Sequence, residues 1–394
     1  MIPMDQCRVL DLGIITAGAA TSAVLADLGA EVIKIESPSY KDPFRIWSGE
    51  TFPGEHPDLP PFFRMTNRGK LNAGIDLKHP KGRDVFLRLV ARSDVVVENF
   101  SRGVMERLGL DFATLKRANP NIILASISSQ GEYGPDARYV SFGSTLEAMA
   151  GLAALTGYEG GAPVVSGIAL NYPDQVVAMF AAGMIATAWH ARGNGAGGVH
   201  LDMSQRELTS FLCGEAFLAA ATPARRGNAQ PGIPVQDCYR ADDGQWVAVT
   251  IRAEQLGALK GLAGDDAAPA LAAWVAGRTA PEAAADLKAH GIDAAQVLDG
   301  RGVLAQRGVA WTRALQQGKD SDMVKGFLFT DDARPMTPSR PAAHCGADTR
   351  EVLHRVGGYS QADIDALIAS AAVASYDQDA PATGTIGVEV VAAQ

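Results

Sequence analysis

The residue best suited to covalent chemistry in this sequence is Asp174. It follows the Tyr172-Pro173 step and precedes an apolar run, residues 176–189, that holds no charged side chain. Because the residue before a proline is disfavoured in the helical region, the pattern predicts a loop that ends at Asp174 and a helix that begins there. An aspartate at a helix start meets unpaired N–H groups and the positive end of the helix dipole. Two roles are open, a helix cap and a carboxylate nucleophile, and position alone favours the cap.

Two further groups of residues place positive charge where a ligand could bind. The run Asn67-Arg68-Gly69-Lys70 puts two cations and a glycine in a polar turn, which suits a phosphate group. On charge alone a solvated loop is the favoured explanation of this turn, because exposed charges are common. Arg107 follows a strand predicted at 94–100, and open α/β sheets bind ligands at the carboxyl ends of their strands. The alternative for Arg107 is a salt bridge with a neighbouring carboxylate.

Several common kinds of site are disfavoured. The first turn, Gly13–Gly18, carries Ile15 where the dinucleotide fingerprint needs its second glycine, so a nicotinamide site is not expected. The sequence has neither a P-loop nor a G-x-S-x-G nucleophile elbow. The spacing of His190 and His200 fits no common zinc site, and we expect both to be solvated histidines at helix ends. No metal site is therefore predicted.

The overall composition limits the partners and the location. The chain has 394 residues, a net charge of −9 and 47% apolar residues. This charge disfavours nucleic acid and anionic membranes as partners, because both require a basic surface. Four scattered cysteines without a C-x-x-C pair are typical of free thiols in a reducing compartment. With no signal peptide and no apolar stretch of spanning length, we expect a cytoplasmic protein.

Alternating strands and helices predict an α/β fold with a Rossmann-like sheet. Strands are expected at 8–12, 31–36, 94–100, 121–127 and 245–251, and helices at 20–28, 81–91, 104–108, 112–118, 176–191 and 203–220. A linker is predicted at 222–234, followed by an Ala-rich helical region at 256–307 and a loop at 331–348. Ser360 and Asp363 should cap a final helix, and the tail after residue 374 has few apolar anchors.

Long runs of the sequence resemble the class III CoA-transferases (CaiB/BaiF type). This family includes formyl-CoA transferase, carnitine CoA-transferase and alpha-methylacyl-CoA racemase. The runs follow the family order over most of residues 5–215: Arg8–Leu12, Leu25–Glu36, Asn67–Lys70, Asp94–Phe100, Glu106–Leu110, Asn119–Ser126, Gly151–Gly157, Ser166–Asp174 and Asp202–Glu207. The last third of the chain matches more loosely, through Ala305–Gly308 and Thr349–Leu353.

The resemblance implies a fold and a site. Asp174 occupies the position of the family's catalytic aspartate, in the loop before the apolar helix. CoA contacts are implied at Thr16 and Ala17, at the turn formed by Asn67, Arg68, Gly69 and Lys70, and at Arg107 near the pyrophosphate. The family fold is a ring-like chain in an interlocked dimer. Its large Rossmann-like domain is built from both chain ends, here 1–221 and 326–394, with a small α/β domain at 235–325.

The function implied is transfer of CoA from an acyl-CoA donor to a carboxylic acid acceptor. The steps pass through an aspartyl anhydride and an aspartyl-CoA thioester, with no tightly bound cofactor. Asp174 needs no activating base, because a carboxylate is ionised at neutral pH and the helix end should keep it so. Two alternatives stay open. One is an acyl-CoA racemase or epimerase, and the other is a CoA-binding subunit that works with an active paralogue.

Three departures from the family pattern bear on these alternatives. Ser37-Pro38 replaces an arginine that some members carry after the second strand. The glycine-rich loop that guards the intermediate in formyl-CoA transferase has no clear counterpart, and 228–232 is the nearest stretch. The racemases carry a His-Asp pair ahead of the catalytic position, whereas the matching stretch here, 139–145, holds no histidine. This last difference favours a covalent acyl carrier over an acid/base residue.

Overall fold

The computed structural model describes residues 4–46, 58–218, 225–264, 267–305 and 340–376, and short strands at 315–317, 323–325, 330–331 and 334–335. The chain divides into two compact units. The larger unit contains residues 1–143, 170–208 and 313–394, and so draws on both ends of the chain. The smaller unit contains 144–169 and 209–312, so residues 144–169, 209–221 and 313–325 lie on the other side of this division from their predicted domain.

The larger unit is built on a seven-stranded sheet in the order β14-β3-β2-β1-β4-β5-β6. All neighbouring strands are parallel except β14, which runs antiparallel to β3. The strands are β1 (Arg8–Asp11), β2 (Glu31–Glu36), β3 (Lys70–Ile75), β4 (Val95–Glu98), β5 (Ile123–Ser128), β6 (His200–Ser204) and β14 (Val373–Ala374). The predicted α/β class is therefore confirmed at the level of a mixed fold with a mostly parallel central sheet.

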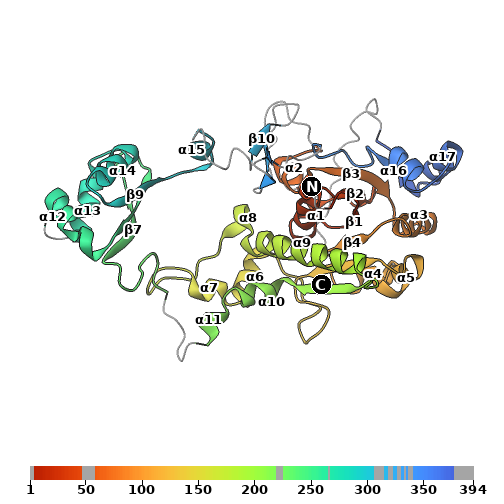
Figure 1. Ribbon diagram of the computed structural model, residues 1–394, viewed down its shortest axis with the longest axis horizontal. Helices are drawn as coiled ribbons and strands as arrows, with labels where there is room; N and C mark the ends of the chain where they lie inside the picture. Colours follow the sequence, from red (N-terminus) through yellow and green to blue (C-terminus); the bar gives the residue numbers. More distant parts are fainter. Residues whose placement is uncertain are drawn as a thin grey trace. The chain divides into compact units, whose positions relative to one another are not determined.

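Helices cover both faces of this sheet, as continuous apolar strands require. One face packs against α1 (Ala17–Asp27) and α9 (Tyr172–Gly193), which lie side by side in Figure 1. The other face packs against α3 (Pro80–Val90), α5 (Phe112–Ala118), α16 (Thr349–Arg355) and α17 (Gln361–Ala369). Alternation along β5 shows the division, because Ile123 and Ala125 face α9 whereas Leu124 belongs to the opposite core.

Three strands of the sheet were not predicted from the sequence: β3, β6 and the short β14. Residues 70–75 form β3, in a region where only a polar turn was expected. Residues 200–204 form β6, so the helix predicted to begin at residue 203 starts later, as α10 (Gln205–Phe211). Strand β6 pairs through its backbone with β5, and no strand of the described residues lies on its other side. An edge strand needs no continuous apolar run, which explains why its polar sequence gave no strand signal.

The helix that carries Asp174 begins two residues earlier than predicted. Asn171 is the N-cap of α9 and adopts a left-handed conformation, with φ of 46°. Pro173 is tolerated in the first turn because its nitrogen has no helical hydrogen bond to lose. Asp174 therefore lies in the first turn rather than at the cap. Neither α9 nor any other described helix has the length and apolarity that crossing a membrane would require.

The C-terminal stretch returns to the N-terminal half of the larger unit. The Asn72 backbone N–H donates to Asp348 Oδ2 at 2.8 Å, and the Gly346 N–H donates to Asn72 Oδ1 at 2.7 Å. The final helix, α17, is capped by Ser360 and Asp363 through reciprocal hydrogen bonds, so the predicted capping box is confirmed. The tail beyond residue 376 lies outside the described residues.

The smaller unit has its own core between a three-stranded antiparallel sheet and three helices. The strands are β7 (Val235–Arg240), β8 (Trp246–Ile251) and β9 (Asp293–Val297), and the helices are α12 (Leu256–Ala263), α13 (Ala267–Ala276) and α14 (Ala280–Ala289). The predicted helical region at 256–307 is thus interrupted by β9.

The other elements are short. They are η1 (Pro43–Arg45), α2 (Pro61–Asn67), α4 (Val104–Arg107), α6 (Gly143–Met149), α7 (Leu152–Leu155), α8 (Gly167–Leu170), α11 (Gly214–Phe217), η2 (Ala253–Gln255), α15 (Gly300–Ala305), β10 (Leu315–Gln317), β11 (Met323–Lys325), β12 (Thr330–Asp331) and β13 (Arg334–Pro335).

Candidate active site

Asp174 lies where the first turns of two helices meet. Its carboxylate accepts hydrogen bonds from its own backbone N–H, in the first turn of α9, and from the backbone N–H of Ala17. Ala17 is the first residue of α1, which packs along α9. The first N–H groups of a helix have no partner within the helix and carry partial positive charge. The carboxylate therefore satisfies donors from both helices.

Burial nevertheless controls the acidity of Asp174. Loss of solvation raises its pKa to about 6, although the two backbone hydrogen bonds act in the opposite direction. The helix-end donors favour the ionised form, as expected, but desolvation outweighs them and raises the pKa above its ordinary value. A pKa near 6 still leaves the group largely ionised at neutral pH. The result is a poorly solvated carboxylate, which is more basic than an exposed one.

The turn between β1 and α1 brings Ala17 to this carboxylate. It is tight, since a Cβ on Gly13 would lie 2.4 Å from the carbonyl carbon of Gly18, and Ile15 has a φ of 57°. Asn99, just after β4, holds the turn with its side chain. Its Oδ1 accepts from the Ile14 N–H at 2.8 Å, and its Nδ2 donates to the Ile14 carbonyl at 3.0 Å. Strands β1 and β4 are neighbours where the strand order reverses, which is the usual ligand position in open α/β sheets.

Buried charges support this turn from within the protein. Asp11 Oδ1 accepts from the Gly13 N–H at 2.7 Å, and Asp11 Oδ2 lies 2.7 Å from Lys70 Nζ. Lys70 also donates to the Ala19 carbonyl at 2.8 Å. Burial lowers the pKa of Lys70 to about 8, although Asp11 acts in the opposite direction. Lys70 therefore ties β3 to the start of α1, and so helps to fix the position of Ala17.

The other residues of the predicted 67–70 turn are also held by protein groups. Asn67 Oδ1 accepts from Lys70 Nζ at 3.0 Å, and Arg68 forms a buried ion pair with Asp27. Gly69 has a φ of 76°, which favours glycine, and its N–H donates to the carbonyl of Arg340 at 2.8 Å. The turn thus joins the β1–α1 region to the C-terminal stretch, and its contact with CoA stays a prediction.

Thr16 carries a buried polar atom that needs an explanation. The residue is only 1% exposed, and within the described part of the chain its Oγ1 has no hydrogen-bond partner. Buried hydroxyl groups nearly always have a partner, so this one calls for an explanation. Thr16 directly precedes Ala17, the residue that contacts the Asp174 carboxylate.

Arg107 is placed differently from the residues around Asp174. It ends the short helix α4, and its side chain is exposed. Its Nη1 would lie 3.1 Å from a Cβ on Gly103, so the guanidinium folds back over the first residues of that turn. Met105 of the same helix packs into the core on the face of the sheet opposite α9. The structure therefore does not bring Arg107 into the cluster formed by Thr16, Ala17 and Asp174.

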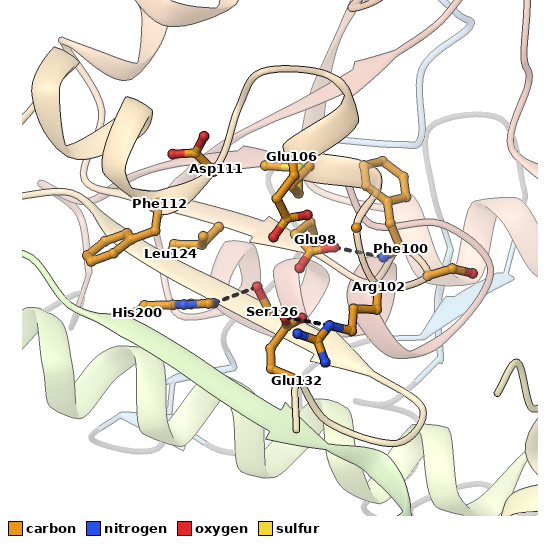
Figure 2. Close-up of a pocket in the computed structure, with 13 residues that line it drawn as sticks. Glu98, Phe100, Arg102, Glu106, Asp111, Phe112, Leu124, Ser126, Glu132 and His200 are labelled. Atoms are coloured by element: carbon orange, nitrogen blue, oxygen red, sulfur yellow. Dashed lines mark hydrogen bonds and ion pairs between the residues drawn. The ribbon is translucent and has the colours of Figure 1, made fainter. Parts of the chain in front are cut away.

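A second polar cluster lies beside α4, on the sheet face opposite α9 (Figure 2). Ser126 Oγ is 2.9 Å from His200 Nε2, and the buried carboxyl of Glu98 hydrogen-bonds to the same serine. Burial raises the pKa of Glu98 to about 7. The cavity here measures about 30 Å³, the share of a single water molecule. His200 is therefore a strand residue in a hydrogen-bonded cluster, and its predicted place as a solvated helix-end histidine is wrong.

Two residues next to Asp174 were not singled out from the sequence. A Cβ on Gly143 would lie 3.2 Å from Asp174 Oδ2 and 3.1 Å from Asn171 Oδ1. Gly143 belongs to the 139–145 stretch, which drew attention only because it lacks a histidine. Asn171 precedes a Tyr-Pro step, and asparagine tolerates the left-handed conformation better than most residues, so its role as N-cap had a weak signal. The contact between Gly143 and Asp174 could not be predicted from the local sequence around either residue.

The chain can be assigned to a protein family. A family model described as CoA-transferase family III matches residues 4–349, and the chain belongs to this family. Within the described residues, no group of His, Cys, Asp or Glu side chains suits a metal ion.

Two curated relatives each match less than two thirds of the chain. Succinyl-CoA–D-citramalate CoA-transferase of Chloroflexus aurantiacus is 34% identical over 258 residues, covering 64% of this chain and 63% of the relative. Acetyl-CoA:oxalate CoA-transferase of Acetobacter aceti is 36% identical over 250 residues, covering 62% of each protein. The matched region thus spans less than two thirds of either relative.

A solved structure matches over more of the chain. The crystal structure of a CAIB/BAIF family protein from Brucella suis superposes with a TM-score of 0.81. It is 25% identical, and the match covers 90% of this chain and 99% of that protein.

Proposed function

We propose that this protein transfers CoA from an acyl-CoA donor to a carboxylic acid acceptor, with Asp174 as the covalent carrier. The observation that carries the proposal is the half-buried carboxylate of Asp174, held between its own N–H and the N–H of Ala17. Desolvation makes a carboxylate more reactive towards a carbonyl carbon, and fixed N–H donors can stabilise the oxyanion that forms. The names of the curated relatives support the same class of reaction.

The reaction uses two covalent intermediates. An Asp174 oxygen attacks the carbonyl carbon of the donor thioester, the C–S bond breaks, and CoA leaves as a thiolate with the electron pair. The thiolate then attacks the aspartyl carbonyl carbon of the anhydride, which releases the donor acid as a carboxylate and leaves an aspartyl-CoA thioester. The acceptor carboxylate attacks the carbonyl carbon of this thioester, the C–S bond breaks, and CoA again leaves as a thiolate while an anhydride with the acceptor forms. Attack by the thiolate on the acceptor carbonyl gives the new acyl-CoA and restores the Asp174 carboxylate.

The first β–α turn supplies contacts for CoA in this proposal. Thr16 directs its unpartnered hydroxyl to the bound thioester, and Ala17 provides the backbone donor. Arg107, with its exposed guanidinium, contacts the pyrophosphate. The Asn67–Lys70 turn contacts CoA through backbone atoms other than the Gly69 N–H, which is bonded to the Arg340 carbonyl, because the side chains of Asn67, Arg68 and Lys70 already have buried partners.

The racemase alternative needs a second acid/base group on the other side of the substrate's α-carbon. Gly143 of the 139–145 stretch lies close to Asp174, and it has no side chain to carry a proton. This contact favours transfer over racemisation. Incubation of a 2-methylacyl-CoA in deuterated water distinguishes the two, since α-deuterium without any acceptor acid would support a racemase.

We infer that the protein is a homodimer, in agreement with the interlocked arrangement implied by the family. The support is the outer face of α9, where Met179, Phe180 and Met184 are 58%, 43% and 49% exposed. Three large apolar side chains on one helix face indicate an interface rather than a solvated surface. The alternative of a hetero-oligomer predicts a chain that binds CoA but transfers it only after a second chain is added.

All four cysteines are free, which suits the predicted cytoplasmic location.

An exchange assay tests the proposed function. Purified protein is incubated with succinyl-CoA or acetyl-CoA and a panel of small dicarboxylic, hydroxy and aromatic acids, and new thioesters are detected by mass spectrometry. We expect a new acyl-CoA to form in step with loss of the donor, without net release of free CoA. Net hydrolysis alone, with every acid of the panel, would contradict a transferase.

A further inference from the structure

Gly143, in the 139–145 stretch, lies close to the proposed nucleophile, Asp174. The three atoms nearest to a Cβ built on this residue are Asn171 Oδ1 at 3.1 Å, Asp174 Oδ2 at 3.2 Å and Asn171 Cα at 3.5 Å. Gly143 is buried and opens the short helix α6. Any side chain at this position would therefore begin in contact with the catalytic carboxylate.

The backbone does not require glycine here. Gly143 is absent from the residues with positive φ, whereas Gly131, Gly134 and Gly151, on either side of it, are among them. An alanine would adopt the same backbone conformation, and in a helix it is favoured over glycine by about 1 kcal/mol. The absence of a side chain at residue 143 therefore calls for an explanation based on space.

The carboxylate has little freedom to move away from a larger residue 143. At 3.1–3.2 Å, the two oxygen atoms lie closer than most atoms come to a Cβ in proteins, so a methyl group would press on Asp174 and Asn171 unless they shift by a few tenths of an ångström. Asp174 is held on its other sides by the N–H groups of Ala17 and of its own residue. Asn171 is the left-handed N-cap of α9, and its backbone cannot shift without disturbing the start of that helix.

We propose that Gly143 is a specificity-determining residue that keeps the Asp174 Oδ2 side open for the acyl group. This inference rests on the proposed function. When Asp174 carries an acyl group as an anhydride, that group must extend from one carboxylate oxygen, and Oδ2 is the oxygen that faces Gly143. A methyl group at residue 143 would occupy the space that a longer acyl chain needs, while the smallest acyl groups would still fit.

The test compares two donors of different size in the same enzyme. Exchange of isotope-labelled acetate into acetyl-CoA and of labelled succinate into succinyl-CoA is measured for the wild type and for Gly143→Ala. We expect Gly143→Ala to lower the ratio of the succinyl to the acetyl kcat/KM by about tenfold or more, because added or lost bulk of one methyl in a pocket changes selectivity on this scale. A ratio of kcat/KM values does not depend on how much of the variant is folded.

Gly261→Ala is the matched control, because it also adds a methyl to a helical glycine. Among the residues that the structure describes, no atom lies within 4 Å of a Cβ built at Gly261, on α12 of the smaller unit. Its selectivity should equal that of the wild type. An unchanged or increased succinyl-to-acetyl ratio of kcat/KM in Gly143→Ala would overturn the inference about Gly143. The proposed function would still stand in that case, provided that the wild type exchanges either acid. If the wild type exchanges neither acid nor any acid of the wider panel, the proposed function itself fails.

Discussion

The backbone N–H of Ala17 donates a hydrogen bond to the carboxylate of Asp174, and this contact joins the first residue of α1 to the first turn of α9. The two residues are far apart in the sequence, and the packing of α1 against α9 on one face of the sheet brings them together. The N–H that stabilises the Asp174 carboxylate is also placed to stabilise an oxyanion on the aspartyl carbonyl of a covalent intermediate. We therefore assign this donor to Asp174 both as a free carboxylate and as an acylated residue.

The acidity of Asp174 predicts the pH dependence of the reaction. Burial raises its pKa from the ordinary value to about 6, and only the ionised carboxylate can attack a thioester. We expect kcat/KM to rise about tenfold per pH unit below pH 6 and to level off above it, because kcat/KM reports groups of the free enzyme. Initial rates across pH 4–8 measure this, at pH values where the fold is shown to persist. A rate that is already level at pH 5 would mean that Asp174 keeps the acidity of an exposed aspartate.

Thr16→Val should separate binding from stability. Removal of a buried hydroxyl without a partner costs no hydrogen bond within the protein, so the free energy of unfolding should stay the same or increase by about 1–3 kcal/mol. KM for the acyl-CoA should rise, because the hydroxyl is assigned to the bound thioester. Urea unfolding and steady-state kinetics measure the two effects.

Thr21→Val is the control for this pair of measurements. The Thr21 hydroxyl is also buried in α1, but it donates to the Ala17 carbonyl at 2.7 Å. Its loss should lower stability and leave KM nearly unchanged. If Thr16→Val instead lowers stability without changing KM, the assignment of its hydroxyl to the ligand is wrong.

Lys70 and Arg107 should behave in opposite ways when each is replaced. Lys70→Met leaves the buried carboxylate of Asp11 without its cation, which should cost about 3–5 kcal/mol of stability. Arg107→Ala removes an exposed side chain, so stability should change little while KM for acyl-CoA rises. Unfolding curves and KM values for both variants test the distinction. A stable Lys70→Met variant would show that Lys70 is not a structural partner of Asp11.

Much of the larger unit was predictable because its strands are apolar and its helices have clear ends. The strand 31–36 and the helix 112–118 match the prediction residue for residue, and the cap at Ser360 was read from its partner Asp363. Strand β6 escaped prediction because an edge strand is stabilised by backbone pairing with β5, which leaves no apolar pattern.

The candidate site was predictable only in part. Asp174 was found through the motifs around it, whereas Gly143 depends on a contact between segments that only the tertiary structure brings together. The pKa of Asp174 likewise depends on burial by α1, which local sequence does not reveal.

The apolar face of α9 predicts a measurable assembly. A variant with both Met179→Glu and Met184→Glu places two charges on that face and should dissociate the dimer, because burying unpaired charge is costly. Light scattering after size exclusion measures the mass, which for a single chain is 41.3 kDa. Trp246→Glu, at an exposed position of β8 in the smaller unit, is the control and should leave the mass unchanged. A wild-type mass of one chain would contradict the inferred homodimer.

Asp174 should become covalently acylated during turnover, and trapping with hydroxylamine detects that state directly. The protein is incubated with succinyl-CoA in the presence of hydroxylamine, digested, and analysed by peptide mass spectrometry. We expect a hydroxamate on Asp174 that forms only when acyl-CoA is present. The Asp174→Asn variant should fold but should be inactive and unmodified. Full transfer activity in Asp174→Asn, or a hydroxamate on another residue with Asp174 intact, would contradict the account.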